Sequence, residues 1–209
     1  LSALYLSAQS ERFPFVEEGK TWIVEFGGYC DFDDDEIFFE RYVLQGDSII
    51  MGKKCKKFFM QHLDRNLQPT SPAWYKAALY EEQEKVYICH EDSTDFKLLF
   101  DISAKIGDTI RIGTGVSNDI NQELGSVLPF TITQIQPWKG DPLRRRFKFD
   151  NDPNVVFTFN YDWVEGIGCT SEPIVPWIHA LTGGYCPRLI KCFVADRTDF
   201  VLSIDHLKV

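Results

Sequence analysis

The chain has 209 residues, of which 44% are hydrophobic and 14% are aromatic, with a formal net charge of -9 and a pI near 4.9. This composition excludes a largely disordered chain and is sufficient for one domain with a sizeable core. The negative charge repels polyanions, so we expect neither nucleic acid nor an anionic membrane as a partner. No apolar stretch approaches the length of a transmembrane helix.

Residues 1–12 are apolar and rich in small side chains until the chain turns polar at Ser10. Because such a pattern is typical of the end of an export signal, we predict a signal-peptide remnant or lead segment here. An ordered first strand and an artificial chain boundary are the alternatives. No linker or low-complexity stretch divides residues 13–209, so we expect a single β domain.

Short segments rich in aromatic and β-branched residues then alternate with turns that contain glycine. The clearest is 155–163, where every second side chain is apolar, a period that fits a half-buried strand and no helix. Gly52 and Lys53 are predicted to form a two-residue hairpin loop. The predicted strands are 21–26, 37–45, 48–51, 54–61, 75–80, 85–90, 96–102, 109–112, 128–136, 144–149, 155–164, 189–195 and 200–204.

Residues 72–85 fit two structures. Ser71 followed by Pro72 satisfies the rules for a helix start. The alternative is a hairpin of 75–80 with 85–90, which we prefer because the second segment is strand-like and needs a neighbour.

Residues 117–124 and 174–181 fit short helical turns. The whole pattern predicts an all-β antiparallel meander of roughly ten to twelve strands, forming a barrel or a sandwich, with one or two short helical turns.

The six cysteines contain no Cys-x-x-Cys pair, which argues against a structural zinc site. Cys186 and Cys192 are close enough in sequence to close a small loop through a disulfide bond, and buried free thiols are the alternative for all six. The basic cluster of Arg144, Arg145 and Arg146 is interpreted as mostly the solvated face of a strand.

One set of segments can be compared with a known group of domains: 16–22, 42–50, 52–53, 85–87, 98–101, 106–109, 146–149 and the Trp-x-Glu-Gly-Ile-Gly segment 163–168. Together these segments resemble a group of uncharacterised exported domains from anaerobic gut-type bacteria. Members are secreted or surface-attached β domains without an established activity. The resemblance therefore implies export, favours the hairpin at 75–90 and implies no mechanism. The group usually has Ser where this chain has Cys169.

Two carboxylate features are candidates for chemistry. Asp31, Asp33 and Asp35 alternate as ligands of Ca²⁺ do, but the Gly and Glu of a calcium loop are missing, so we prefer a solvated acidic turn and predict no metal or cofactor. Glu165 lies near Trp163, where a raised pKa would suit a general acid. A structural Glu at a bulge is the preferred interpretation.

Trp74, Tyr75, Trp138 and Trp177 lie near prolines in predicted loops. Exposed aromatic rings suit sugar stacking or a protein partner, and anchoring of the loops is the alternative. We therefore expect a secreted, cell-surface or periplasmic β domain without enzymatic activity, which binds a glycan or a surface protein or serves as a structural module. The alternative function is an extracellular hydrolase acting on carbohydrate or peptide through Glu165 or the acidic run.

Overall fold

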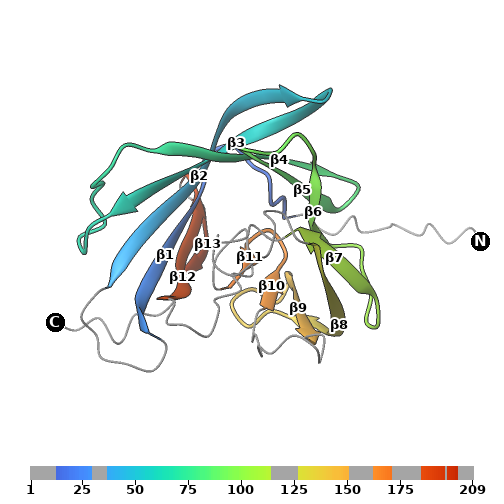
Figure 1. Cartoon of the computed structure of the whole chain (residues 1–209). Helices are drawn as coiled ribbons and strands as arrows, with labels where there is room; N and C mark the ends of the chain where they lie inside the picture. Colours follow the sequence, from blue (N-terminus) through green and yellow to red (C-terminus); the bar gives the residue numbers. More distant parts are fainter. Residues whose placement is uncertain are drawn as a thin grey trace, which may run out of the picture.

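The computed structural model describes residues 13–29, 37–113, 127–150, 162–170, 185–195 and 197–201. Within these ranges the chain forms thirteen strands and no helix, so the predicted all-β class is confirmed. The strands make two antiparallel sheets that curl around one core (Figure 1). Over the same residues, no helix is long and apolar enough to cross a bilayer.

The larger sheet has eight strands in the order β13-β12-β1-β2-β3-β4-β5-β6. The strands β1 to β6 follow one another as an antiparallel meander, and the last two strands return to pair beside β1. The first and last strands described are therefore separated only by β12. The strands are β1 (Lys20–Tyr29), β2 (Phe38–Ile50), β3 (Lys53–Leu63), β4 (Trp74–Glu82), β5 (Lys85–His90), β6 (Lys97–Asp101), β12 (Tyr185–Val194) and β13 (Arg197–Val201).

The smaller sheet has five strands in the order β11-β10-β9-β8-β7. It meets the larger sheet on both sides, because β6 and β7 lie side by side and the Leu189 N–H of β12 donates to the Thr170 carbonyl after β11, at 3.2 Å. The strands are β7 (Thr109–Gly113), β8 (Val127–Pro137), β9 (Arg145–Asp150), β10 (Asp162–Val164) and β11 (Gly168–Cys169).

Aromatic side chains from both sheets fill the core between them. Phe100 of β6 stacks on Trp163 of β10 with ring centroids 4.1 Å apart. The same Phe100 ring meets Phe147 of β9 edge to face at 5.3 Å. All three side chains are at most 1% exposed. Burial of each such ring stabilises the fold by about 2–3 kcal/mol, so these contacts hold the two sheets together.

The finer prediction of a barrel with roughly ten to twelve strands is wrong, because the thirteen strands of the described residues divide between two curled sheets. Alternation along a strand predicts which face is buried, but not where the ladder of hydrogen bonds is interrupted. The described residues contain no helical turn of the predicted kind. Both segments predicted as helical, 117–124 and 174–181, lie outside the described residues, as do residues 155–161.

Residues 72–85 form the predicted hairpin and not a helix. Leu79 faces Ile88 across β4 and β5, and both side chains are buried in the core. The loop is Gln83–Glu84, with φ of 52° and 62°. Positive φ at both loop residues is the geometry of a type I′ turn, which fits the right-handed twist of the strands.

The loop between β2 and β3 differs by one residue from the prediction. Ile50 pairs with Lys53, so the two loop residues are Met51 and Gly52, with φ of 47° and 75°. Glycine tolerates this left-handed backbone, but methionine adopts it at a cost. Because Met51 is apolar, the sequence pattern assigned it to the preceding strand.

β1 is buried on both faces. Trp22, Val24 and Phe26 face the core, as the alternation predicts. On the other face, Ile23 packs in a second apolar cluster with Phe39 and Ile190. A central strand that is covered on both sides has no solvent-facing half, so alternation describes only one of its faces.

Of the two alternatives for Cys186 and Cys192, the disulfide bond is excluded. Both residues lie in the extended strand β12, six positions apart, and Cys192 is a free thiol. At about 3.3 Å per residue their Cα atoms are roughly 20 Å apart, far beyond the ~7 Å limit of a disulfide. Cys55 and Cys89 are also buried free thiols, and Cys169 is buried.

Candidate functional site

Trp74 and Tyr75, two of the predicted ligand-binding residues, open β4 and lie on opposite faces of the larger sheet. Trp74 pairs with Met60, whose side chain packs against the core. Tyr75 pairs with Phe59, with the two rings edge to face at 6.1 Å. Because neighbouring strand residues point to opposite sides, these two aromatics belong to different surfaces.

Polar side chains gather beside Trp74 at one end of the core face. Glu40 of β2 is paired with His62 of β3, and 3.5 Å separates Glu40 Oε1 from His62 Nδ1. The Tyr42 hydroxyl donates to Glu40 Oε2. The imidazole of His62 lies against the indole of Trp74, with ring centroids 4.8 Å apart. We call Glu40, Tyr42, His62 and Trp74 the Glu40 cluster.

The Glu40 cluster extends from the buried interior to solvent. The Glu40 side chain is 9% exposed, whereas that of His62 is 46% exposed. Burial raises the pKa of Glu40, and the hydrogen bond from Tyr42 and the nearby His62 and Lys76 oppose that shift only in part. A buried carboxyl group with a perturbed pKa beside an accessible imidazole is a recurring property of functional sites.

The sequence analysis did not single out Glu40 or His62. Their contact depends on the pairing register of β2 with β3, which a single sequence does not fix. A signal was nevertheless present in β2, where Glu40 occupies a position on the face that carries Phe38, Tyr42 and Leu44. A carboxylate in the apolar register of a strand indicates either a paired charge or a functional group.

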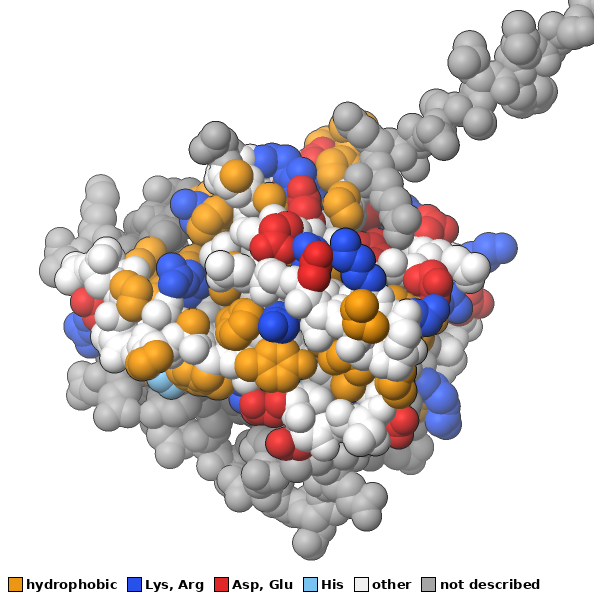
Figure 2. All heavy atoms as spheres, turned by 90° about the horizontal axis from the view of Figure 1, so that it is seen from above, with side chains coloured by type: hydrophobic (Ala, Val, Ile, Leu, Met, Phe, Trp, Pro, Cys, Tyr) orange, Lys and Arg blue, Asp and Glu red, His pale blue; other side chains and the backbone are white. Residues whose placement is uncertain are grey.

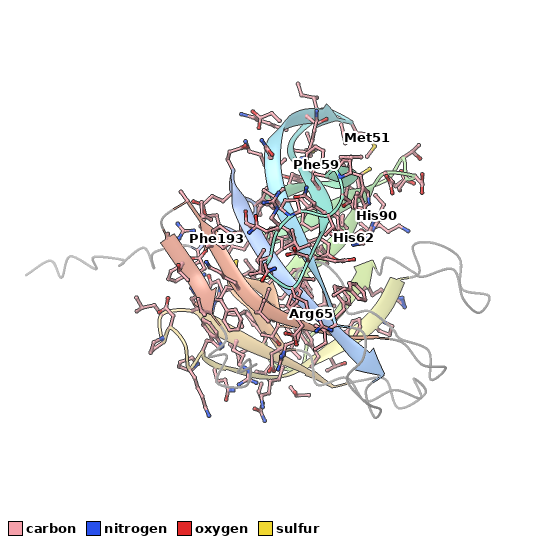
Figure 3. All side chains as sticks on the ribbon, turned by 90° about the vertical axis from the view of Figure 1, so that its left-hand side faces the viewer. Met51, Phe59, His62, Arg65, His90 and Phe193 are labelled. Carbon is pink, nitrogen blue, oxygen red and sulfur yellow. The ribbon has the colours of Figure 1, made fainter. Side chains whose placement is uncertain are left out.

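His90 of β5 is a further polar group on the core face. It pairs with Ala77, which belongs to the core. Burial lowers the pKa of His90, and its buried Nε2 has no hydrogen-bond partner among the described residues. An unsatisfied buried nitrogen costs about 1–3 kcal/mol. Figure 3 labels His90 with His62 and shows Met51 away from them, at the tip of the β2–β3 hairpin.

The opposite face of β3, β4 and β5 carries a surface of half-buried aromatic rings. Tyr80 and Tyr87 stack with centroids 4.7 Å apart, and Phe96 meets Tyr80 edge to face at 4.7 Å. Figure 2 views this side of the molecule and shows apolar side chains gathered among charged ones. We call this the outer aromatic surface; its residues are Phe59, Tyr75, Tyr80, Tyr87 and Phe96.

Trp138 packs against the protein in the way the loop-anchoring alternative describes. It follows β8, and its ring lies 5.5 Å from that of Phe200 in β13. A Cβ atom placed on Gly140 would lie 2.6 Å from the indole, so the ring also covers the turn backbone. Trp177 lies outside the described residues.

Glu165 is buried and held by Arg145. The guanidinium Nε donates to Glu165 Oε2 at 3.0 Å, and the Arg145 N–H donates to the same oxygen at 3.4 Å. Asp31, Asp33 and Asp35 lie outside the described residues. No group of three or more His, Cys, Asp or Glu side chains in the described ranges is placed to hold a metal ion.

No protein-family model, curated protein or solved structure matches this chain. Its function is therefore argued from the geometry of the two surfaces, and the resemblance to exported domains stays a prediction.

Proposed function

We propose that the protein is a secreted or cell-surface module that binds a glycan without catalysing a reaction, and that the Glu40 cluster holds the sugar. The observation that carries this proposal is the contact of the Trp74 indole with the half-exposed His62, which is in turn paired with the buried carboxyl group of Glu40.

A sugar ring presents C–H groups on its faces and hydroxyl groups on its rim. An indole provides an apolar plane for the faces. Carboxyl and imidazole groups can accept or donate hydrogen bonds to hydroxyl groups. The Glu40 cluster supplies both kinds of group on one face of the sheet.

The outer aromatic surface supports glycan binding less well. Tyr80 and Tyr87 are almost parallel, with 9° between their planes, so each ring turns one face toward the other and not toward solvent. Phe96 occupies a further side of Tyr80. Rings packed on one another form a continuous apolar surface, which is better suited to another protein than to a sugar.

Trp74 and Tyr75 give a matched pair of variants for the test, because they are adjacent in sequence and face opposite ways. The unmodified protein is screened on a glycan array, and calorimetry measures the affinity for the best glycan. Trp74→Ala should weaken binding about fivefold or more, since an aromatic contact contributes about 1 kcal/mol or more. Tyr75→Ala should leave the affinity unchanged.

Three outcomes would contradict the proposal. One is the absence of glycan binding in a folded sample. Another is loss of binding in Tyr75→Ala with normal binding in Trp74→Ala, which would assign the partner to the outer aromatic surface. The third is release of reducing sugar or cleaved peptide from the ligand.

Hydrolysis is the second candidate, and the raised pKa of Glu40 favours it, because a carboxyl group that keeps its proton can act as a general acid. On this alternative, Glu40→Gln abolishes turnover while the melting temperature is retained. On the binding proposal, the same variant retains binding within a few-fold, because glutamine keeps a hydrogen-bonding oxygen at this position.

A further inference from the structure

A network of buried charges joins the first strand of the larger sheet to its last. Lys20 opens β1 and is 0% exposed, and Asp199 lies in β13 and is 7% exposed. The Nζ atom of Lys20 is 3.9 Å from Asp199 Oδ2 and 4.0 Å from Glu17 Oε2. A buried amine, a buried carboxyl group and a partly exposed second carboxylate thus meet at one place.

The strands direct the side chains of Lys20 and Asp199 toward each other. In β13, Phe200 pairs with Cys192 and Thr198 pairs with Phe193, so Asp199 is the extra residue of a β-bulge. A bulge redirects a side chain, and here the carboxylate turns inward although β13 is the edge strand. Lys20 lies two residues before Trp22 and therefore on the core face, from which its long side chain reaches past β12.

The partners of Asp199 are arranged unequally around its two oxygens. Arg144 Nη2 and Arg197 Nε donate to Oδ1, at 2.7 Å and 2.8 Å. Oδ2 accepts only from Arg197 Nη2 among these groups, at 3.1 Å, and is the oxygen nearest to Lys20. The ammonium group of Lys20 donates hydrogen bonds to the carbonyls of Pro14 and Gly166, which fix the position of Nζ.

We propose that Lys20 and Asp199 form an intramolecular isopeptide bond. Lys20 first passes a proton through the Glu17 carboxylate to Oδ2 of Asp199, which makes Cγ electrophilic, and the Nζ lone pair then attacks Cγ. Negative charge develops on Oδ1, where Arg144 and Arg197 already donate. The bond from Cγ to Oδ2 breaks, and Oδ2 leaves as water with two of the three ammonium protons, carried by Glu17. The third proton stays on the new amide, and no oxidant or cofactor is consumed.

The charges of the site favour this condensation. Burial lowers the pKa of Lys20, which increases the share of the neutral amine that attacks. The reaction removes one positive and one negative buried charge, and buried charges are costly. After the Asp199 charge is lost, Arg144 is still paired with Asp141, at 3.1 Å, and Arg197 is still paired with Glu17, at 2.6 Å. Nζ lies 3.9 Å from Oδ2 of the carboxyl group that it attacks. A near-attack geometry brings the reacting atoms Nζ and Cγ to ~3–3.5 Å, so the reaction requires a movement of the Lys20 or Asp199 side chain.

The test is the mass of the intact, denatured protein measured after expression of the full chain. The proposal predicts a mass one water molecule below the sum of the residues. After digestion, it predicts a branched peptide that contains Lys20 and Asp199, with no tryptic cleavage after Lys20. A folded, soluble protein whose mass equals the full sum overturns the proposal.

Two variants keep the test specific. Asp199→Asn retains the shape of the side chain, and its condensation with Lys20 should release ammonia in place of water. The linked variant should therefore have the same mass as the linked parent, which is one ammonia molecule below the sum of the variant's own residues. Glu17→Gln cannot accept the proton from Lys20, so this variant should stay unlinked although Glu17 is partly exposed and outside the core. Full linkage in Glu17→Gln would overturn the role assigned to Glu17.

Discussion

Glu40 and His62 face each other across β2 and β3, and their side chains meet on the face of the sheet that otherwise packs the core. The neighbouring positions on that face of β2 carry Tyr42 and Leu44, which belong to the core. A carboxyl group in such surroundings is costly to ionise, and this cost gives the protein a specific dependence on pH.

We expect Glu40→Gln to stabilise the protein at neutral pH. Burial raises the pKa of Glu40 above its value in the unfolded chain. The stability that the protonated form contributes is therefore complete below the unfolded pKa and is lost as pH rises through the folded pKa. Glutamine stays neutral, so the variant should be more stable by about 1 kcal/mol or more at pH 7 and by less at pH 4.

Urea unfolding from pH 4 to pH 8 measures this difference. Glu82→Gln is the control, because Glu82 forms an exposed ion pair with Lys53 and its loss should change stability by less than ~1 kcal/mol. A Glu40→Gln variant that is less stable than the parent at pH 7 would show that the ionised carboxylate is needed for folding.

We expect Met51→Asn to stabilise the β2–β3 hairpin. Met51 has φ of 47° at the first position of a type I′ turn, where Asn followed by Gly is the preferred pair. Its side chain is 58% exposed, so the substitution removes little packing. The gain in unfolding free energy should be roughly 0.5–1 kcal/mol. Met51→Leu retains the strain and should leave the stability unchanged; an equal gain in both variants would refute the explanation.

Local patterns predicted much of the fold. The hairpin of β4 and β5 followed from strand propensity and the need of residues 86–90 for a neighbour. Turns without glycine were harder to place, since Gln83 and Glu84 adopt positive φ through the twist of the strands and not through their own preference. The division into two sheets depends on long-range pairing, which alternation does not encode.

The sites were less predictable than the strands. Lys20 of β1 and Asp199 of β13 meet because β12 pairs with both of these strands in the larger sheet. Arg144 was interpreted as part of a solvated face, yet it is 3% exposed. Its charge is compensated by Asp199 from another strand and by the Glu165 carbonyl, contacts that no local pattern contains. Among the predicted aromatics, only the pairing register shows that Trp74 and Tyr75 point to opposite faces.

The four cysteines whose side chains the structure describes, Cys55, Cys89, Cys169 and Cys192, should be unreactive in the folded protein. Burial raises the pKa of Cys192 to about 12 and also raises the pKa of Cys55 and of Cys89. Because the thiolate is the reactive form, iodoacetamide at pH 8 should modify none of them until urea unfolds the chain. Peptide mapping locates the modified residues. Rapid modification of Cys192 under native conditions would contradict its burial.

Gly166 should tolerate substitution poorly. It has φ of +72°, and a Cβ atom there would lie 2.7 Å from both Arg144 Nη1 and Phe13 Cβ. Gly46 has φ of +76° with no atom within 4 Å of the added carbon, so Gly46→Ala is the matched control. Gly46→Ala should lower the free energy of unfolding by about 1–2 kcal/mol, the cost of a left-handed backbone at alanine. Gly166→Ala should lower it by about 2–4 kcal/mol, because the added Cβ atom also displaces Arg144 from its buried partners. Chemical unfolding of both variants measures the difference, and equal losses would show that the contacts around Gly166 relax without cost.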